Sequence, residues 1–220
     1  MDRSSRNRLN ERHLQLFAGD SLFERIARAV CRAGCLPRKE LYEAWEVARR
    51  VHRRFRGGRV VDLASGHGLL AQILLLMDRD IPEALAVDRR VPENAALLAA
   101  ELGRDWPALG ARLRFVESDL EQVPLFAEDI VVSVHACGGL TDLVLERAMA
   151  AGSRVAVLPC CHDLRSAEAG GLQGWLDGPL AVDVTRAALL RSRGYRIYTQ
   201  SIPDDITPKN RLLMGEPGCR

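Results

Sequence analysis

Hydrophobic residues recur along the chain with two different periods, one helical and one extended. A helical period covers residues 21–34, and a second covers 38–55 and ends at Gly57. Residues 1–20 show no period, and we expect them to be irregular and mobile. From residue 59 onward, short continuous apolar runs alternate with helical patterns. The pattern therefore predicts two helices followed by alternating strands and helices.

The alternating region predicts a parallel sheet that is covered on both faces, because crossover helices bury both sides of apolar strands. Strands are expected at 59–63, 84–87, 113–116, 130–134, 154–158, 195–201 and 211–214. Helices are expected between them at 69–77, 93–102, 143–150 and 182–193. A proline-containing stretch separates the last two strands, which predicts that the final strand returns antiparallel to its neighbour. The predicted fold is α/β, a Rossmann-like seven-stranded and mostly parallel sheet with an antiparallel last strand.

Length and composition are those of one folded unit. The chain has 220 residues, of which 47% are hydrophobic and 27% charged. We expect a basic helical extension over 1–57 and the main domain over 58–220. The sequence has no apolar run long enough for a transmembrane helix and no apolar leader at its start. These features predict a cytoplasmic protein without a membrane partner, and they leave the oligomeric state open.

The charge is distributed unevenly along the chain. Residues 1–59 hold 15 basic and 7 acidic side chains, whereas the remainder holds 16 basic and 22 acidic ones. The densest basic run is 49–56, which includes Arg53 and Arg54. Such a run is typical of a phosphate-binding surface for nucleic acid. A solvated face of an arginine-rich helix is the alternative interpretation.

Six cysteines could suggest disulfides or zinc, but their spacing favours neither. Thiols of an intracellular α/β protein stay reduced. Cys31 and Cys35 are one helical turn apart and lack a second pair, while Cys160, Cys161 and His162 are adjacent in sequence. Adjacent ligands suit neither a tetrahedral zinc site nor a redox pair. We therefore expect no metal, and thiols that act as small buried hydrophobic groups.

The sharpest motif is a glycine-rich turn between the first strand and the helix that follows it. The strand ends around Asp62, and the small residues Ala64, Gly66 and Gly68 lead directly into the helix. Glycine lets a ligand approach the backbone closely, and the free N–H groups of the helix start point into the same space. The next strand ends in Asp88, whose carboxylate can accept both hydroxyls of a ribose.

A third acid, Asp119, follows the third strand, where it could reach an adenine amino group. The same turn is compatible with a dinucleotide, since a small residue, Ala71, stands at the third position of that fingerprint. A nicotinamide oxidoreductase is disfavoured because no Ser/Tyr/Lys or His/Asp hydride machinery is suitably spaced. The ordered acids and the turn together favour a nucleoside cofactor.

Taken in order, these features resemble the class I methyltransferases over about residues 58–216. The resemblance implies S-adenosylmethionine as the cofactor, with its methionine end over the glycine turn. It also implies that Asp88 holds the ribose and that the adenine lies beside the third strand. The cofactor-binding residues implied in this way are Asp62, Ala64, Gly66, Gly68, Asp88, Asp119 and Leu120.

The end of the fourth strand is where such enzymes present groups to the transferred methyl. Amino-group methyltransferases usually carry Asn or Asp, two prolines and an aromatic residue there, and this chain carries none of them. It offers His135, which could act as a general base, and Cys137, which is either a nucleophile or a buried thiol. Asp142 is expected to cap the following helix.

Three short runs resemble the methyltransferase domain 25 family, which includes a tRNA 2′-O-methyltransferase group. They cover 135–142, 159–162 and 206–211. The resemblance implies that His135 and Cys137 line the methyl-transfer pocket, with Cys161 and His162 opposite. The residues predicted to face the substrate are Arg53, Arg54, His162, Lys209 and Arg211.

The sequence thus predicts an S-adenosylmethionine-dependent methyltransferase that acts on an oxygen of tRNA or rRNA. A small-molecule methyltransferase is the first alternative, with the N-terminal helices as a lid whose Leu41, Tyr42 and Trp45 cover the acceptor. A cofactor-binding scaffold without enzymatic activity is the second. The acceptor molecule and the methylated atom stay open.

Overall fold

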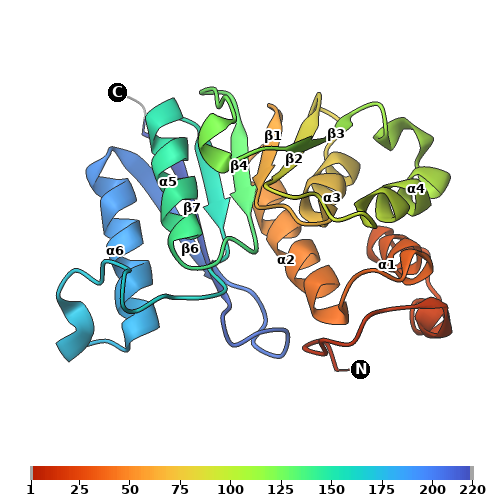
Figure 1. The fold of residues 1–220 in the computed structure, drawn as a ribbon, viewed down its shortest axis with the longest axis horizontal. Coiled ribbons are helices and arrows are strands. Elements are labelled where there is room, and N and C mark those ends of the chain that lie inside the picture. Colours follow the sequence, from red (N-terminus) through yellow and green to blue (C-terminus); the bar gives the residue numbers. More distant parts are fainter. Residues whose placement is uncertain (1, 219–220) are drawn as a thin grey trace.

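A seven-stranded sheet forms the centre of the computed structural model, which describes residues 2–218 (Figure 1). The strand order is β3-β2-β1-β4-β5-β7-β6, and β7 runs antiparallel to both β5 and β6. The predicted sheet with its reversed last strand is therefore confirmed. The strands are β1 (Val60–Leu63), β2 (Ala84–Asp88), β3 (Leu113–Glu117), β4 (Ile130–Ser133), β5 (Arg154–Val157), β6 (Tyr195–Ser201) and β7 (Arg211–Pro217).

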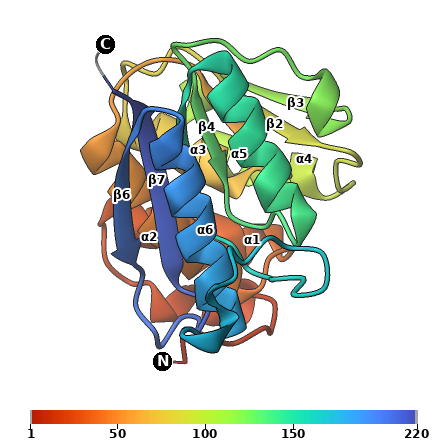
Figure 2. The same ribbon diagram turned by 90° about the vertical axis from the view of Figure 1, so that its left-hand side faces the viewer.

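Six α-helices accompany the sheet within the described residues. They are α1 (Leu22–Ala33), α2 (Arg38–Arg54), α3 (Leu69–Met77), α4 (Ala95–Asp105), α5 (Gly139–Ala151) and α6 (Gly178–Ser192). Helices α5 and α6 cover one face of the sheet, and α2 and α3 lie on the other (Figure 2). No described helix combines the length and the hydrophobicity that crossing a membrane would require.

Alternate residues of the central strands supply the two cores. In β1, Val60 faces the core that contains α1 to α3, whereas Val61 and Leu63 face the core of α5. Successive side chains of a strand point to opposite faces, so a strand that is apolar at both kinds of position must be covered on both sides. The continuous apolar runs of the sequence have this cause.

The N-terminal segment is ordered against the rest of the chain, contrary to the prediction of a mobile start. Leu9 and Phe17 are buried, and a short 3-10 helix spans Glu11–Leu16. The backbone N–H of Leu9 donates to the carbonyl of Leu36 over 2.9 Å. The prediction failed because two isolated apolar residues produce no period, although each fills a gap between helices.

Helices α1 and α2 share one hydrophobic core with α3 and the sheet. Arg32 of α1 also donates to the Glu101 carboxylate of α4 over 2.7 Å. The predicted boundary at residue 57 thus falls inside a continuous core.

Parallel strands β1, β2, β4 and β5 end at the same edge, the carboxyl edge of the sheet. This edge carries the candidate site.

Candidate functional site

The turn after β1 has an unusual backbone. Ala64, Gly66 and Gly68 have φ values of +57°, +53° and +66°, and Ala64 is the one non-glycine residue with positive φ within residues 2–218. Such a conformation costs about 1–2 kcal/mol for a residue with a side chain. Strain of this kind often accompanies a binding site. The turn therefore holds a shape that the sequence alone does not favour.

The two glycines of the turn serve different purposes. A Cβ built on Gly66 meets nothing within 4 Å, so this face of the turn is open to a ligand. A Cβ on Gly68 would lie 2.9 Å from the Ala86 Cβ and 3.0 Å from the Phe115 ring. The expectation that both glycines leave room for a ligand is thus correct for Gly66, whereas Gly68 allows the helix to pack on β2 and β3.

Asp62 is buried at the end of β1 and accepts a hydrogen bond from the Ala71 N–H over 3.2 Å. Burial raises the pKa of Asp62 to about 8, and the nearby charge of Asp88 adds to the increase. The carboxyl group is therefore largely protonated at neutral pH. A cation placed beside it would favour the ionised form.

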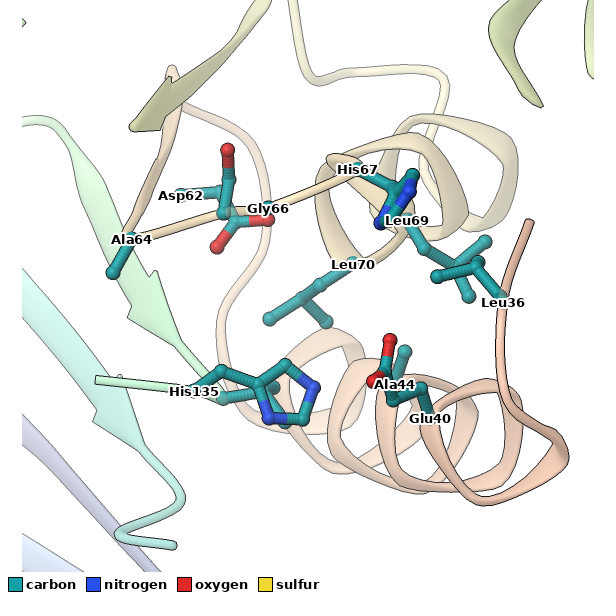
Figure 3. A pocket seen from close by; sticks show the side chains of 12 residues that line it. Leu36, Glu40, Ala44, Asp62, Ala64, Gly66, His67, Leu69, Leu70 and His135 are labelled. Atoms are coloured by element: carbon teal, nitrogen blue, oxygen red, sulfur yellow. The ribbon is translucent and has the colours of Figure 1, made fainter. Parts of the chain in front are cut away.

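A cavity of about 50 Å³ lies against the turn, between β1, β4 and α2 (Figure 3). Glu40 of α2 and His135 at the end of β4 point into it from opposite sides. The Ser65 hydroxyl also lines it and is buried without a hydrogen-bond partner within residues 2–218. An unpaired buried hydroxyl costs about 1–3 kcal/mol, which a ligand that accepts or donates there would recover. The turn thus has the open backbone and the unused polar atom that a cofactor would need.

Asp88 and Asp119 follow neighbouring strands, as the sequence predicts. Asp88 accepts from the Gly66 N–H over 2.9 Å, so the acid and the turn hold each other in place. Asp119 pairs with the exposed Arg89 over 2.8 Å. Leu120, by contrast, is buried in the α5 core. The structure therefore leaves the two acids at the open edge, with Leu120 packed in the core behind them.

His135 lines a second cavity as well, with a volume of about 330 Å³. Burial lowers the pKa of His135 to about 4, and the charge of Lys39 lowers it further. The side chain is nevertheless exposed to solvent at the cavities, so the imidazole is accessible, and its neutral form is favoured. The other polar residues of this cavity are Arg6, Lys39, Glu40, Glu43, Cys160, Cys161, Thr207 and Lys209.

Sequence reasoning missed Glu40 and Ser65. Ser65 lies inside the glycine motif, and its position there was a usable signal. Glu40 gave none, because one acid among the many charges of α2 is not distinctive. Burial raises the pKa of Glu40, and the Glu43 charge adds to this effect.

The two cavities are lined by neither Leu41 nor Tyr42 nor Trp45. Leu41 and Tyr42 are buried in the core, and the rings of Tyr42 and Trp45 each contact Phe23 at 5.1 Å. The opposite face of α2, with Glu40 and Ala44, lines the smaller cavity. Helix α2 therefore closes the site with a different face from the predicted one.

Cys137, Cys160 and Cys161 meet at the carboxyl edge, where their three sulfur atoms lie within 4.8 Å of one another. We call these residues the thiol cluster. The sequence analysis placed Cys137 and Cys161 on opposite sides of a pocket, but it did not foresee that their sulfurs would converge. Cys31 and Cys35 are buried, as expected, whereas Cys219 lies outside the described residues.

A network of charged residues supports the loop that carries the thiol cluster. His162 is hydrogen-bonded to the Asp183 carboxylate over 2.7 Å, and the same carboxylate accepts a hydrogen bond from Arg211 over 2.7 Å. Arg186 is buried and pairs with Asp142 over 2.7 Å. His162 and Arg211 thus have partners within the protein, and together with Lys209 they also line a separate cavity of about 240 Å³.

Asp142 does not cap α5. The helix begins at Gly139, three residues before this acid, and Asp142 lies in its first turn. Gly138 has φ of +60° and lets the chain enter the helix earlier than its hydrophobic period suggests.

Arg53 and Arg54 are not part of the site. The Arg54 guanidinium pairs with Glu216 over 2.8 Å, at the edge of the sheet opposite to the strand ends that carry His135. At 1.5 Å per residue, α2 rises about 21 Å between Glu40 and Arg54. Arg49 and Arg50 both pair with Glu46. Three of these arginines share two acidic partners, so the run keeps a net positive charge, and its C-terminal end lies far from the cavities.

Comparison with known proteins adds the following findings. Residues 38–168 match the model of a protein family described as a methyltransferase domain. The match covers more than half of the chain. It begins at the first residue of α2 and includes the glycine turn, His135 and the thiol cluster.

Two curated relatives are similar over most of the chain. The first is a glutathione S-transferase C-terminal domain-containing protein homolog of Drosophila melanogaster, 27% identical in an alignment 201 residues long that covers 72% of this chain and 33% of that protein. The second is the glutathione S-transferase C-terminal domain-containing protein of Mus musculus, 24% identical over 198 residues, 73% of this chain and 30% of that protein. The chain thus spans about a third of the length of these relatives.

Solved structures share the fold. An O-methyltransferase family protein from Burkholderia thailandensis has a TM-score of 0.55 and 20% identity, over 94% of this chain and 63% of that chain. The 1,6-didemethyltoxoflavin-N1-methyltransferase of the same organism, with bound S-adenosylhomocysteine, has a TM-score of 0.54 and 18% identity, over 80% of this chain and 79% of that chain. The Bacillus subtilis tRNA methyltransferase TrmK has a TM-score of 0.52 and 15% identity, over 80% of this chain and 65% of that chain. At these identities the likeness concerns the fold.

Proposed function

Because the chain belongs to the methyltransferase domain family and has the fold of class I methyltransferases, we propose that it transfers a methyl group from S-adenosylmethionine to a small polar acceptor. The observation that carries this proposal is the junction of two cavities. One lies on the glycine turn, the other is lined by charged residues, and His135 and Glu40 line both. A donor and an acceptor bound in these two cavities would meet beside His135.

The residues of the turn fit the two ends of the cofactor. Asp62 would ionise beside the ammonium group, Gly66 leaves its backbone open, and Asp88 at the next strand tip can accept from ribose hydroxyls. Each oxygen of the Asp88 carboxylate can accept more than one hydrogen bond. The small cavity would hold the methionine end, and Asp119 would lie on the nucleoside side of the open strand ends. When bound, the cofactor supplies an electrophilic methyl group on a sulfonium.

His135 would accept the proton that the acceptor loses. As the acceptor takes the methyl group from the sulfonium, its proton would move to a neutral ring nitrogen of His135. The low pKa keeps this nitrogen unprotonated at neutral pH. In-line alignment of acceptor, methyl and sulfur supplies the larger part of the rate, because the reaction needs little covalent help.

The lining of the larger cavity favours a small acceptor over RNA. Its volume of about 330 Å³ is bounded by the N-terminal segment, α2 and the loop 207–209. The interpretation as an RNA enzyme depended on the basic run 49–56, Lys209 and Arg211. Arg53 and Arg54 lie at the opposite edge of the sheet and Arg211 pairs with Asp183, so only Lys209 of this set lines the larger cavity. Arg6, Lys39 and Lys209 are the basic groups at the cavity itself, and they would suit an anionic small molecule.

The test is to incubate the protein with methyl-labelled S-adenosylmethionine and two fractions of cell extract, a small-molecule pool and purified RNA. We expect label in the small-molecule pool. In His135→Asn, methyl transfer measured at saturating cofactor should fall by about 10²–10⁴-fold. Asp80→Asn, an exposed acid outside the site, serves as the matched control.

Label in RNA would overturn the choice of acceptor while leaving methyl transfer intact. An absence of label in both fractions, with normal cofactor binding, would favour the cofactor-binding scaffold instead.

A further inference from the structure

The thiol cluster has the composition and the spacing of a metal site. The Cys137 and Cys160 sulfur atoms are 2.9 Å apart, and all three sulfurs of the cluster lie within 4.8 Å of one another. A tetrahedral zinc ion with Zn–S bonds of about 2.3 Å separates its sulfur ligands by about 3.8 Å. The Cys137–Cys160 distance is shorter than this value and no pair exceeds 4.8 Å, so rotations of the side chains would bring the sulfurs to an ion.

The fold brings these three residues together from distant parts of the sequence. Cys137 follows β4 and Cys160 and Cys161 follow β5, and the two strands are parallel neighbours. The Gly138 N–H donates to the Cys161 carbonyl over 3.2 Å, which fixes one loop against the other. The argument from sequence against zinc considered the adjacent Cys160 and Cys161 without Cys137, which the neighbouring strand provides.

The charges around the cluster favour a divalent cation bound by three thiolates. Three thiolates and one Zn²⁺ carry a net charge of minus one. The Lys209 ammonium lies 3.7 Å from the Cys161 sulfur and would offset it.

We propose that Cys137, Cys160 and Cys161 bind one Zn²⁺ ion, whose fourth coordination position faces the acceptor cavity. Thiolate sulfur selects zinc or copper(I) among the common cellular ions, and three protein ligands are typical of zinc sites that keep one position for solvent or substrate. Cys160 and Cys161 line the larger cavity together with His135, so a donor atom in that cavity can reach the ion. This site does not depend on the proposed methyl transfer.

The test measures the metal content of the full chain, purified under reducing conditions without chelators, by elemental and native mass spectrometry. We expect one zinc per chain. Competition with a chromogenic chelator should show that Cys137→Ser, Cys160→Ser and Cys161→Ser each weaken zinc binding at least tenfold. Cys31→Ala and Cys35→Ala, which alter buried thiols in another part of the fold, should bind zinc like the wild type.

Circular dichroism establishes that each variant is folded, and Cys137 and Cys161 are exposed, so their replacement leaves the core intact. Cobalt(II) added to the metal-free protein provides a second measurement, because thiolate coordination gives it strong charge-transfer absorption. Reduced protein that binds no zinc would overturn the proposal, as would unchanged affinity in the three variants. Copper in place of zinc would overturn the choice of ion. Acid-quenched cells in which Cys137 and Cys160 form a disulfide would show a redox pair instead.

Discussion

Burial in the protein changes the protonation equilibria of single residues at the site from those of the same side chains in water. Asp62 is protonated because it is buried, and His135 is neutral because its surroundings disfavour a charge. A bound cofactor would change the first of these states, since its ammonium group attracts a carboxylate. Protonation and ligand binding are then linked at Asp62.

Cofactor binding should therefore release a proton from Asp62. The free protein has a pKa of about 8 at this residue, and the ammonium lowers it in the complex. S-adenosylmethionine affinity should rise with pH up to about 8 and then level off. Asp62→Asn keeps an acceptor for the Ala71 N–H but should bind the cofactor about tenfold or more weakly, without this dependence on pH.

Calorimetry in buffers of different ionisation enthalpy measures the released proton. Asp80→Asn is the control, because it changes an exposed acid outside the cavity. If the wild-type affinity for S-adenosylmethionine is constant between about pH 6 and about pH 8, Asp62 stays in one protonation state on binding.

The two glycines of the turn form a matched pair. Gly66→Ala adds a Cβ into open space at positive φ, which costs about 1–2 kcal/mol of unfolding free energy. Gly68→Ala has the same backbone cost and also crowds Ala86 and Phe115, for a total of about 2–5 kcal/mol. We expect Gly68→Ala to lose more unfolding free energy than Gly66→Ala. Relative to its smaller loss of stability, Gly66→Ala should lose more affinity for the cofactor.

Chemical denaturation and equilibrium binding on both variants would check this. Equal losses of stability would argue against the packing role assigned to Gly68.

At the scale of elements, the sequence predicts those features whose signal lies in neighbouring residues of the chain. The helix at Leu69–Met77 and the strand ends at Asp62 and Asp88 follow from neighbouring residues, and the predictions for them are confirmed. The thiol cluster and Glu40 depend on which elements become neighbours, and no local pattern encodes this. The predicted start of α5 was wrong although its signal is local. Gly138 allows the helix to begin before the apolar period of its sequence begins.

The buried Arg186 of α6 connects its own helix to α5. Its guanidinium donates to Asp142 and to Asp183, and Asp183 in turn holds His162 in the loop of the thiol cluster. Removal of one member of a buried ion network leaves its partners uncompensated. Arg186→Met should lower the free energy of unfolding by about 3–5 kcal/mol.

Arg191→Met, an exposed position on the same helix, should change the stability by less than about 0.5 kcal/mol. Urea denaturation of the two variants provides the comparison. If they are equally stable, the Arg186 network contributes no more than a surface charge.

For the whole molecule, α1 and α2 belong to the core of the sheet. The family match begins at the first residue of α2, before the strands, and α2 lines both cavities. Its Leu41, Val47 and Val51 are fully buried. The basic charge of this region therefore accompanies a helix that closes the site and supports the fold.

A chain of residues 58–220 should consequently fail to fold, because its sheet would expose the face that α2 and α3 bury together. Truncation at this point would remove cofactor binding along with acceptor turnover, whereas a detachable lid would remove turnover alone. A chain that begins at Ser5 is the control, since it loses the exposed Arg3–Asp205 pair, which contributes about 1 kcal/mol at most. Thermal unfolding followed by circular dichroism should show a cooperative transition for the control and none for the shorter chain. A shorter chain that unfolds cooperatively and still binds S-adenosylmethionine would mean that the first two helices are an accessory to a domain that is complete without them.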